Sequence, residues 1–208
     1  MYKRQIYAVL NNRADMAGGA CNSPPFLRIE ASPRGLTFAQ FSHADLEAVQ
    51  RVRERLPWYV PHIAFEGPTI PEEGIEVFTS AYPFLVALEK SDEAMVYSMV
   101  KIMHTHFDEY KDNAPGAGGW ILDRQKFEQA FVPFHEGAIR YYKEIGAWTD
   151  RADENNQRNL YRQSILREAW NKFLPSAPDG YQEFEEAWTK YREQALAKVN
   201  LITLGQGL

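Results

Sequence analysis

The chain has 208 residues, of which 45% are hydrophobic and 13% aromatic, and this composition indicates a globular protein with a sizeable core in one large domain or two small ones. The formal net charge is -5, and acidic and basic residues are mixed along the chain without a basic block, which excludes nucleic acid as the expected partner. No uncharged apolar stretch approaches the roughly 18 to 20 residues of a membrane span, so we expect a protein that is not itself membrane-embedded.

The part of the chain from Ile6 to about Lys90 has the pattern of a mixed α/β structure. Short apolar runs at 36–38 and 74–78 predict strands between turns that contain proline and glycine. One helix interrupts them: it is predicted to begin at Ser42, which can cap free backbone N–H groups. The apolar face of this helix comprises Leu46, Val49, Val52 and Leu56. The nearly continuous apolar run 81–88 predicts a central strand buried on both faces.

From Ser91 onward the pattern is helical. Helices are predicted over Asp92 to about His106, around 123–130 and over 135–145, and Gly146 is a suitable C-cap for the last. Two longer amphipathic helices follow over 150–173 and 181–199, joined by a segment with two prolines and a glycine. Their apolar stripes predict a helical hairpin that packs on the main body.

Several groups of residues could suggest catalysis or metal binding, and each has a simpler interpretation. His104 and His106 precede Asp108, but residues two apart on a helix point about 200° away from each other, so one ion could not take both. His135 lacks a serine, thiol or paired-carboxylate partner, which favours a capping or packing role. The turn 115–119 lacks the Lys-Ser/Thr of a phosphate loop and is interpreted as a surface turn. No catalytic residue, metal or cofactor is therefore predicted.

The segment 14–25 has the pattern of a ligand-binding turn. It is interpreted as a short strand that leads into two glycines and then into Asn-Ser-Pro-Pro before a short helix. Such a turn exposes backbone N–H groups at the N-terminus of a helix, where an anion is favourably bound. The chain's single cysteine, Cys21, lies in this segment and cannot form an internal disulfide.

The segment 134–146 carries a specific resemblance. Its Pro-containing approach, His, Gly-Ala-Ile-Arg-Tyr-Tyr run and Glu-Ile-Gly end resemble the late signature of the TAXI family of solute receptors for TRAP transporters. The segments 13–19, 22–32, 57–61, 67–71 and 96–110 resemble other family segments in the same order. The resemblance covers about residues 11 to 149. Two departures are that the turn at 66–69 lacks the usual tyrosine and that the family's receptors are considerably longer.

The resemblance implies an α/β fold of the type II periplasmic-binding kind, incomplete at the N-terminus. Residues 1–149 would be a partial solute-binding domain, and residues 150–208 a helical hairpin extension packed on it. Implied partners are a small organic anion or amino acid and the membrane permease subunits of the transporter, with a periplasmic location although the chain has no signal peptide. The residues expected to face the ligand are Gly18, Gly19, Asn22, Ser23 and Tyr82.

Two other functions remain open from the sequence. The chain could be an interaction module without a ligand, with its two terminal helices as the partner surface. It could also be a small enzyme that uses His135 or the pair His104 and His106.

Overall fold

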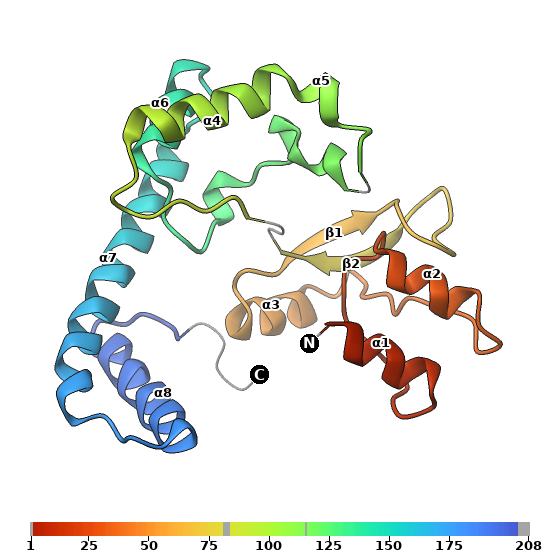
Figure 1. The fold of residues 1–208 in the computed structure, drawn as a ribbon, viewed down its shortest axis with the longest axis horizontal. Helices are drawn as coiled ribbons and strands as arrows, with labels where there is room; N and C mark the ends of the chain where they lie inside the picture. The colour runs from red at the N-terminus through yellow and green to blue at the C-terminus, as the bar shows by residue number, and fades with distance from the viewer. Residues whose placement is uncertain (1, 81–83, 115, 204–208) are drawn as a thin grey trace. The chain divides into compact units, whose positions relative to one another are not determined.

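A computed structural model describes residues 2–80, 84–114 and 116–203 (Figure 1). The chain divides into two compact units. The first comprises Met1–Arg51, Tyr59–Ser80 and His104–Arg124, and the second comprises Val52–Trp58, Ala81–Met103 and Gln125–Leu208. Among the described helices, none has the length and apolar character needed to cross a bilayer.

The core of the first unit is formed by two short helices, α1 (Tyr2–Leu10) and α2 (Pro24–Glu30). Ile6 and Val9 of α1 are buried against Phe26 and Ile29 of α2, because a spacing of three residues places each pair on one face of its helix. The strand predicted before the glycine turn is wrong, since α1 ends at Leu10 and residues 13–18 form no strand.

The first unit also contains a β-hairpin. Strands β1 (Val60–Ala64) and β2 (Ile75–Thr79) pair antiparallel with Val60 opposite Thr79, and β2 confirms the strand predicted at 74–78 (Figure 1). Residues 36–38 were predicted as a strand but do not form one. Instead, Phe38 packs edge-on against Phe26, with ring centroids 5.5 Å apart, so its apolar character serves the core between α1 and α2.

The central strand predicted over 81–88 is not formed by residues 84–88, and residues 81–83 lie outside the described part of the chain. Val86 is 78% exposed and Leu88 80% exposed. A strand buried on both faces needs neighbouring strands, whereas the only strands among the described residues are β1 and β2, which pair with each other. The described residues are mostly helical, so they do not form the multi-stranded sheet of the predicted α/β class.

Helices α3 (Leu46–Arg55) and α4 (Glu93–Thr105) confirm two sequence predictions, with one change of boundary. Helix α3 begins at Leu46 rather than Ser42 because Asp45 caps it: its Oδ1 atom accepts a hydrogen bond from Ala48 N at 2.9 Å. The last residues of α3 belong to the second unit, and the last residues of α4 belong to the first. The first unit continues after α4 with the short helices α5 (Phe107–Tyr110), η1 (Ala117–Trp120) and η2 (Leu122–Arg124).

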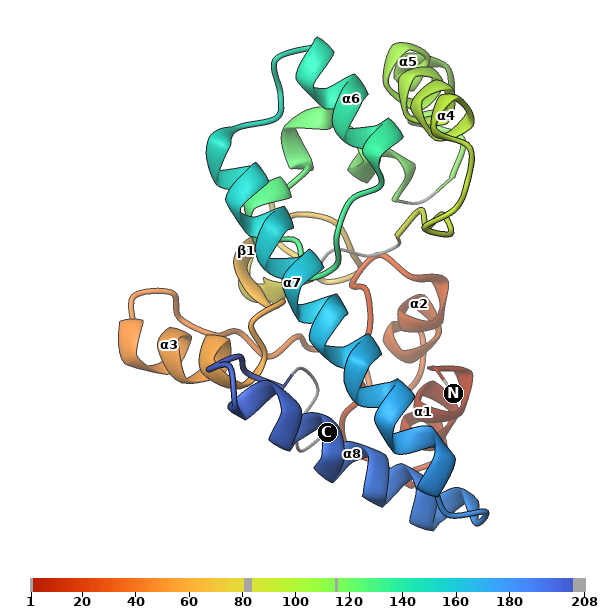
Figure 2. The ribbon, with the colours of Figure 1, turned by 90° about the vertical axis from the view of Figure 1, so that its left-hand side faces the viewer.

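The second unit is built from helices. Helix α6 (Glu136–Glu144) buries Tyr141, and Gly146 has the positive φ of +70° expected of the predicted C-cap. Helices α7 (Asp150–Phe173) and α8 (Tyr181–Ala197) form the predicted hairpin through η4 (Leu174–Ser176), as Figure 2 shows. Aromatic rings fill the contact between them, from Trp170, Phe173, Phe184, Trp188 and Tyr191.

The helix predicted around 123–130 is replaced by the two 3-10 turns η2 and η3 (Phe127–Gln129). Asparagines on α7 hold the loop that contains η3. Asn155 and Asn159 both donate to Ala130 O at 2.8 Å, and Asn156, only 2% exposed, accepts from Phe134 N at 2.8 Å. These bonds satisfy loop carbonyl and amide groups that burial would otherwise leave unpaired. The second unit therefore joins α7 to residues that precede 149, and the domain boundary predicted there stays a prediction.

Candidate functional site

The turn predicted to face an anion lies before α2 in the first unit. Gly18 and Gly19 are exposed, and Ser23 stands at the N-cap of α2 without a side-chain bond to the helix. The first two helical residues, Pro24 and Pro25, have no backbone N–H group. Of the neighbouring amides, Ser23 N donates to Ala20 O, and Phe26 N donates to Ser23 O, both at 3.0 Å. Because the start of this seven-residue helix provides few donors, an anion here depends on side chains.

One of the residues predicted to face a ligand, Asn22, belongs to a group of polar side chains around a carboxylate. Asn22 Nδ2 donates to Glu66 Oε2 at 3.0 Å, and Arg124 Nη2 lies 3.8 Å from Glu66 Oε1. We call Asn22, Glu66 and Arg124 the Glu66 cluster. Its members come from three segments of the first unit: the turn before α2, the turn after β1, and η2. The two oxygens of one carboxylate are thus held by an amide and a guanidinium from different parts of the sequence.

Glycines allow these segments to approach. Gly67 has φ of +145°, and a Cβ atom there would lie 2.8 Å from Cys21 O, so this position requires glycine. A Cβ atom on Gly116 would lie 3.5 Å from Asn22 Nδ2. The turn 115–119, interpreted from sequence as a plain surface turn, therefore contributes to the surroundings of Asn22. Pro115 itself is outside the described residues.

The charged members of the Glu66 cluster are open to solvent. The side chains of Arg124 and Glu66 are 53% and 54% exposed. Solvent screens an ion pair of this kind, whose contribution to stability is about 0.2–1 kcal/mol. The guanidinium and the amide can therefore exchange partners at small cost, which is a property required of a binding site.

Cys21 adjoins the cluster, and its surroundings disfavour the thiolate. Partial burial raises the pKa of the thiol, and its backbone hydrogen bond offsets this only in part. The reactive form of cysteine is the thiolate, which a raised pKa disfavours at neutral pH. Tyr82, the remaining residue predicted to face a ligand, lies outside the described residues, so its role stays a prediction.

The histidines have structural partners. His135 is the N-cap of α6, and its Nδ1 atom accepts a hydrogen bond from Gly137 N at 3.1 Å, which confirms the capping interpretation. His106 Nδ1 lies 2.7 Å from Glu109 Oε1. His104 is in the last turn of α4. Among the described residues, no group of three or more histidine, cysteine or acidic side chains is arranged to hold a metal ion.

A polar network between α4 and α6 was not predicted from the sequence. Tyr97 Oη donates a hydrogen bond to Glu144 Oε2 at 2.5 Å, and Lys101 Nζ lies 3.5 Å from Glu144 Oε1. The Arg140 guanidinium lies over the Tyr97 ring, 4.2 Å from its centroid, and forms an ion pair with Glu93 at 2.6 Å. The hydrogen bond from Tyr97 and, less strongly, the charge of Lys101 lower the pKa of Glu144. Each charge faces an opposite charge, so the network joins two helices rather than recognising an ion.

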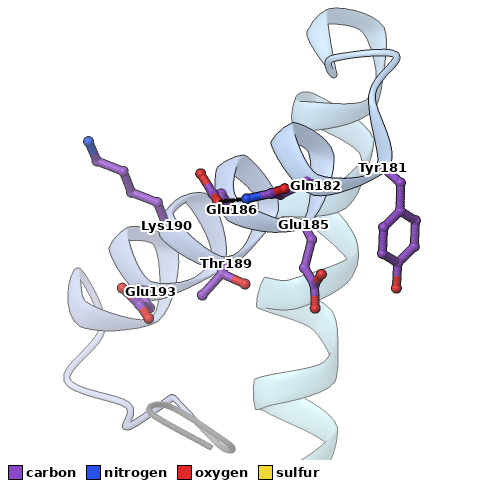
Figure 3. A pocket seen from close by; sticks show the side chains of 7 residues that line it. All are labelled: Tyr181, Gln182, Glu185, Glu186, Thr189, Lys190 and Glu193. Carbon is purple, nitrogen blue, oxygen red and sulfur yellow. Dashed lines mark hydrogen bonds between the residues drawn. The ribbon is translucent and has the colours of Figure 1, made fainter.

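A hollow lies along one side of α8 (Figure 3). All the residues that line it come from this single helix, between Tyr181 and Glu193, so it has no opposite wall. Glu185, Glu186 and Glu193 outnumber Lys190 there. The negative charge disfavours an anion, and we assign no ligand to this surface.

The protein family that matches this chain covers the part that contains the Glu66 cluster. The NMT1-like family matches residues 2–146. The chain belongs to the NMT1-like family. This is a periplasmic-binding-protein-like family whose members are generally non-catalytic, bind small molecules for transporters and are typically periplasmic. A search of curated proteins and a search of solved structures gave no match.

The family match ends at Gly146, the residue of positive φ that follows the C-cap Ile145 of α6. It therefore contains all three members of the Glu66 cluster and the whole segment on which the sequence resemblance depends. The hairpin of α7 and α8 lies beyond the match, and its interpretation as an extension stays a prediction.

Proposed function

We propose that this chain is the solute-binding part of a receptor for a TRAP-type secondary transporter, of the TAXI group, and that it binds a small carboxylate or amino acid without catalysis. The match to the NMT1-like family over residues 2–146 carries this proposal at the level of a binding protein. The resemblance of 134–146 to the TAXI signature supports the finer assignment. A periplasmic location, permease subunits as partners and a type II α/β architecture belong to the same proposal.

The Glu66 cluster supports an anion as the ligand. Carboxylates are recognised by charge-assisted hydrogen bonds from arginine and by amide donors. Arg124 and Asn22 provide one of each, and both already face carboxylate oxygens of Glu66. We add Arg124 to the predicted ligand residues Gly18, Gly19, Asn22, Ser23 and Tyr82.

Sequence reasoning passed over Arg124 because an arginine in a short polar stretch has no pattern of its own. The signal that could have found it is indirect. The glycines of 116–119 precede it, and such a glycine-rich turn marks a place where backbone approaches another group.

The proposal is tested by thermal unfolding of the chain with dicarboxylates, 2-oxoacids and acidic amino acids. A ligand that binds only the folded state at 100 times its dissociation constant adds about 2.7 kcal/mol to stability, so about 1 mM of each compound detects a micromolar ligand. We expect at least one carboxylate to raise the transition temperature. If none does, and the chain dimerises through α7 and α8, the interaction-module alternative is favoured.

A further inference from the structure

The carboxylate of Glu66 occupies the two donors that the proposed function assigns to a ligand. Its Oε2 atom accepts from Asn22 Nδ2 at 3.0 Å, and its Oε1 atom lies 3.8 Å from Arg124 Nη2. The donors are 102 positions apart in the sequence (124 minus 22), and this one side chain contacts both of them. A carboxylate supplied by the protein thus stands in the position expected for a carboxylate of the solute.

We infer that Glu66 is a built-in competitor of the solute: its carboxylate fills the anion position between Asn22 and Arg124 and must leave when a ligand carboxylate binds. Glu66 then lowers the affinity for the solute, and it favours ligands that offer two oxygens in one plane. The inference rests on the proposed function, because competition requires a solute.

The surroundings of Glu66 allow the exchange. Its side chain is more than half exposed, so leaving the cluster returns its carboxylate to water rather than to an apolar site. It precedes Gly67, in a turn rather than in a strand or helix. Gly116 lies next to the Asn22 amide and has no side chain, so it offers no hydrogen-bond acceptor that could take the place of the Glu66 carboxylate.

The charge of the cluster favours a carboxylate over a phosphate. Arg124 is its single cation, so replacing Glu66 by one ligand carboxylate keeps one positive charge opposite one negative charge. A phosphate dianion would place two negative charges on the one group that faces Arg124, with no second cation in the cluster, and like charges nearby disfavour it.

The size of the effect follows from the ion pair that Glu66 makes. An exposed pair is worth about 0.2–1 kcal/mol, so its removal strengthens binding of a competing anion by up to about fivefold. The test compares Glu66→Gln with Glu73→Gln in the full chain. Glu73 is an exposed glutamate in the next turn of the same unit, so both variants lose one negative charge and differ only in the contact with Arg124 and Asn22.

The first measurement follows the side-chain NMR signals of Asn22 and Arg124 during titration with succinate. We expect both signals to move and the apparent Kd to be lower for Glu66→Gln than for Glu73→Gln. Equal values, or a Kd that is higher for Glu66→Gln, overturn the competitor role while the receptor function stands. Succinate binding that leaves the Asn22 and Arg124 signals unmoved also overturns the competitor role while the receptor function stands.

The second measurement needs no ligand. Phenylglyoxal reacts with accessible guanidinium groups, and peptide mass spectrometry gives the rate at Arg124. We expect faster labelling of Arg124 in Glu66→Gln than in Glu73→Gln, and equal rates overturn the inference. Faster labelling in a chain that binds no anion in either variant shows that Glu66 covers Arg124, but it overturns the receptor function and competition with it. Circular dichroism confirms that both variants are folded.

Discussion

A close contact between α4 and α6 in the second unit gives a sharp prediction for Gly137→Ala. A Cβ atom on Gly137 would lie 2.3 Å from Glu93 O and 2.8 Å from Tyr97 N, both backbone atoms of α4 or its start. Backbone atoms cannot rotate away as a side chain would, so α6 must move away from α4. This movement also stretches the Arg140–Glu93 and Tyr97–Glu144 contacts.

Two effects of opposite sign set the magnitude. Overpacking a close contact costs about 1–3 kcal/mol, with the upper half appropriate for a backbone obstacle. Alanine is favoured over glycine in a helix by about 1 kcal/mol. The expected net loss in the free energy of unfolding is therefore about 1–2 kcal/mol.

Urea unfolding of the second unit, followed by tryptophan fluorescence, measures the effect. The control is Gly118→Ala, where the nearest atom to the new Cβ would be Lys111 O at 3.9 Å and no strain is expected. We expect a lower urea midpoint with an unchanged slope for Gly137→Ala alone. A Gly137→Ala chain as stable as the original would show that the α4–α6 contact is not built as described.

Two further predictions concern polar contacts of the second unit. Asn159→Ala removes one of the two donors to Ala130 O, and because Asn155 still donates there, it should lower the free energy of unfolding by about 0.5–1.5 kcal/mol. The exposed neighbour Gln157→Ala should change it little, and equal effects would contradict the role of Asn159. Tyr97→Phe removes the main cause of the lowered pKa of Glu144, which should rise toward its ordinary value in an NMR titration. A carboxyl group whose pKa is lowered by folding stabilises the fold above its unfolded-state pKa, and this stabilisation is lost as the pH falls through its folded-state pKa. The variant lacks most of this stabilisation, so acidification should reduce its free energy of unfolding less than that of the original chain. An unchanged pKa of Glu144 in the Tyr97→Phe variant would refute the role of the Tyr97 hydrogen bond.

The sequence predicted the long helices because their signals are local. Helices α4, α6, α7 and α8 each have an apolar stripe of helical spacing, and His135 and Gly146 mark the ends of α6. Strands were predicted less well because a strand depends on its partners. The run 84–88 has the composition of a buried strand but no strand beside it among the described residues.

The candidate site was predicted only in part for a related reason. Asn22 was expected to face a ligand from the pattern of its own turn together with the family resemblance. Glu66 and Arg124 are members only because folding brings their turns to Asn22, and nothing in their local sequence indicates this. The asparagines of α7 that hold the η3 loop were missed in the same way.

The most direct test of the central claim is isothermal titration of the chain with the carboxylate that most raises its transition temperature. Arg124→Gln should weaken binding by up to about fivefold, since a carboxylate paired with an exposed guanidinium contributes about 0.2–1 kcal/mol. Arg51→Gln removes another exposed arginine that pairs with a glutamate in the first unit, and it should leave the Kd unchanged. No binding by the original chain, or equal Kd values for the two variants, would contradict the assignment of this chain as an anion receptor with Arg124 in its site.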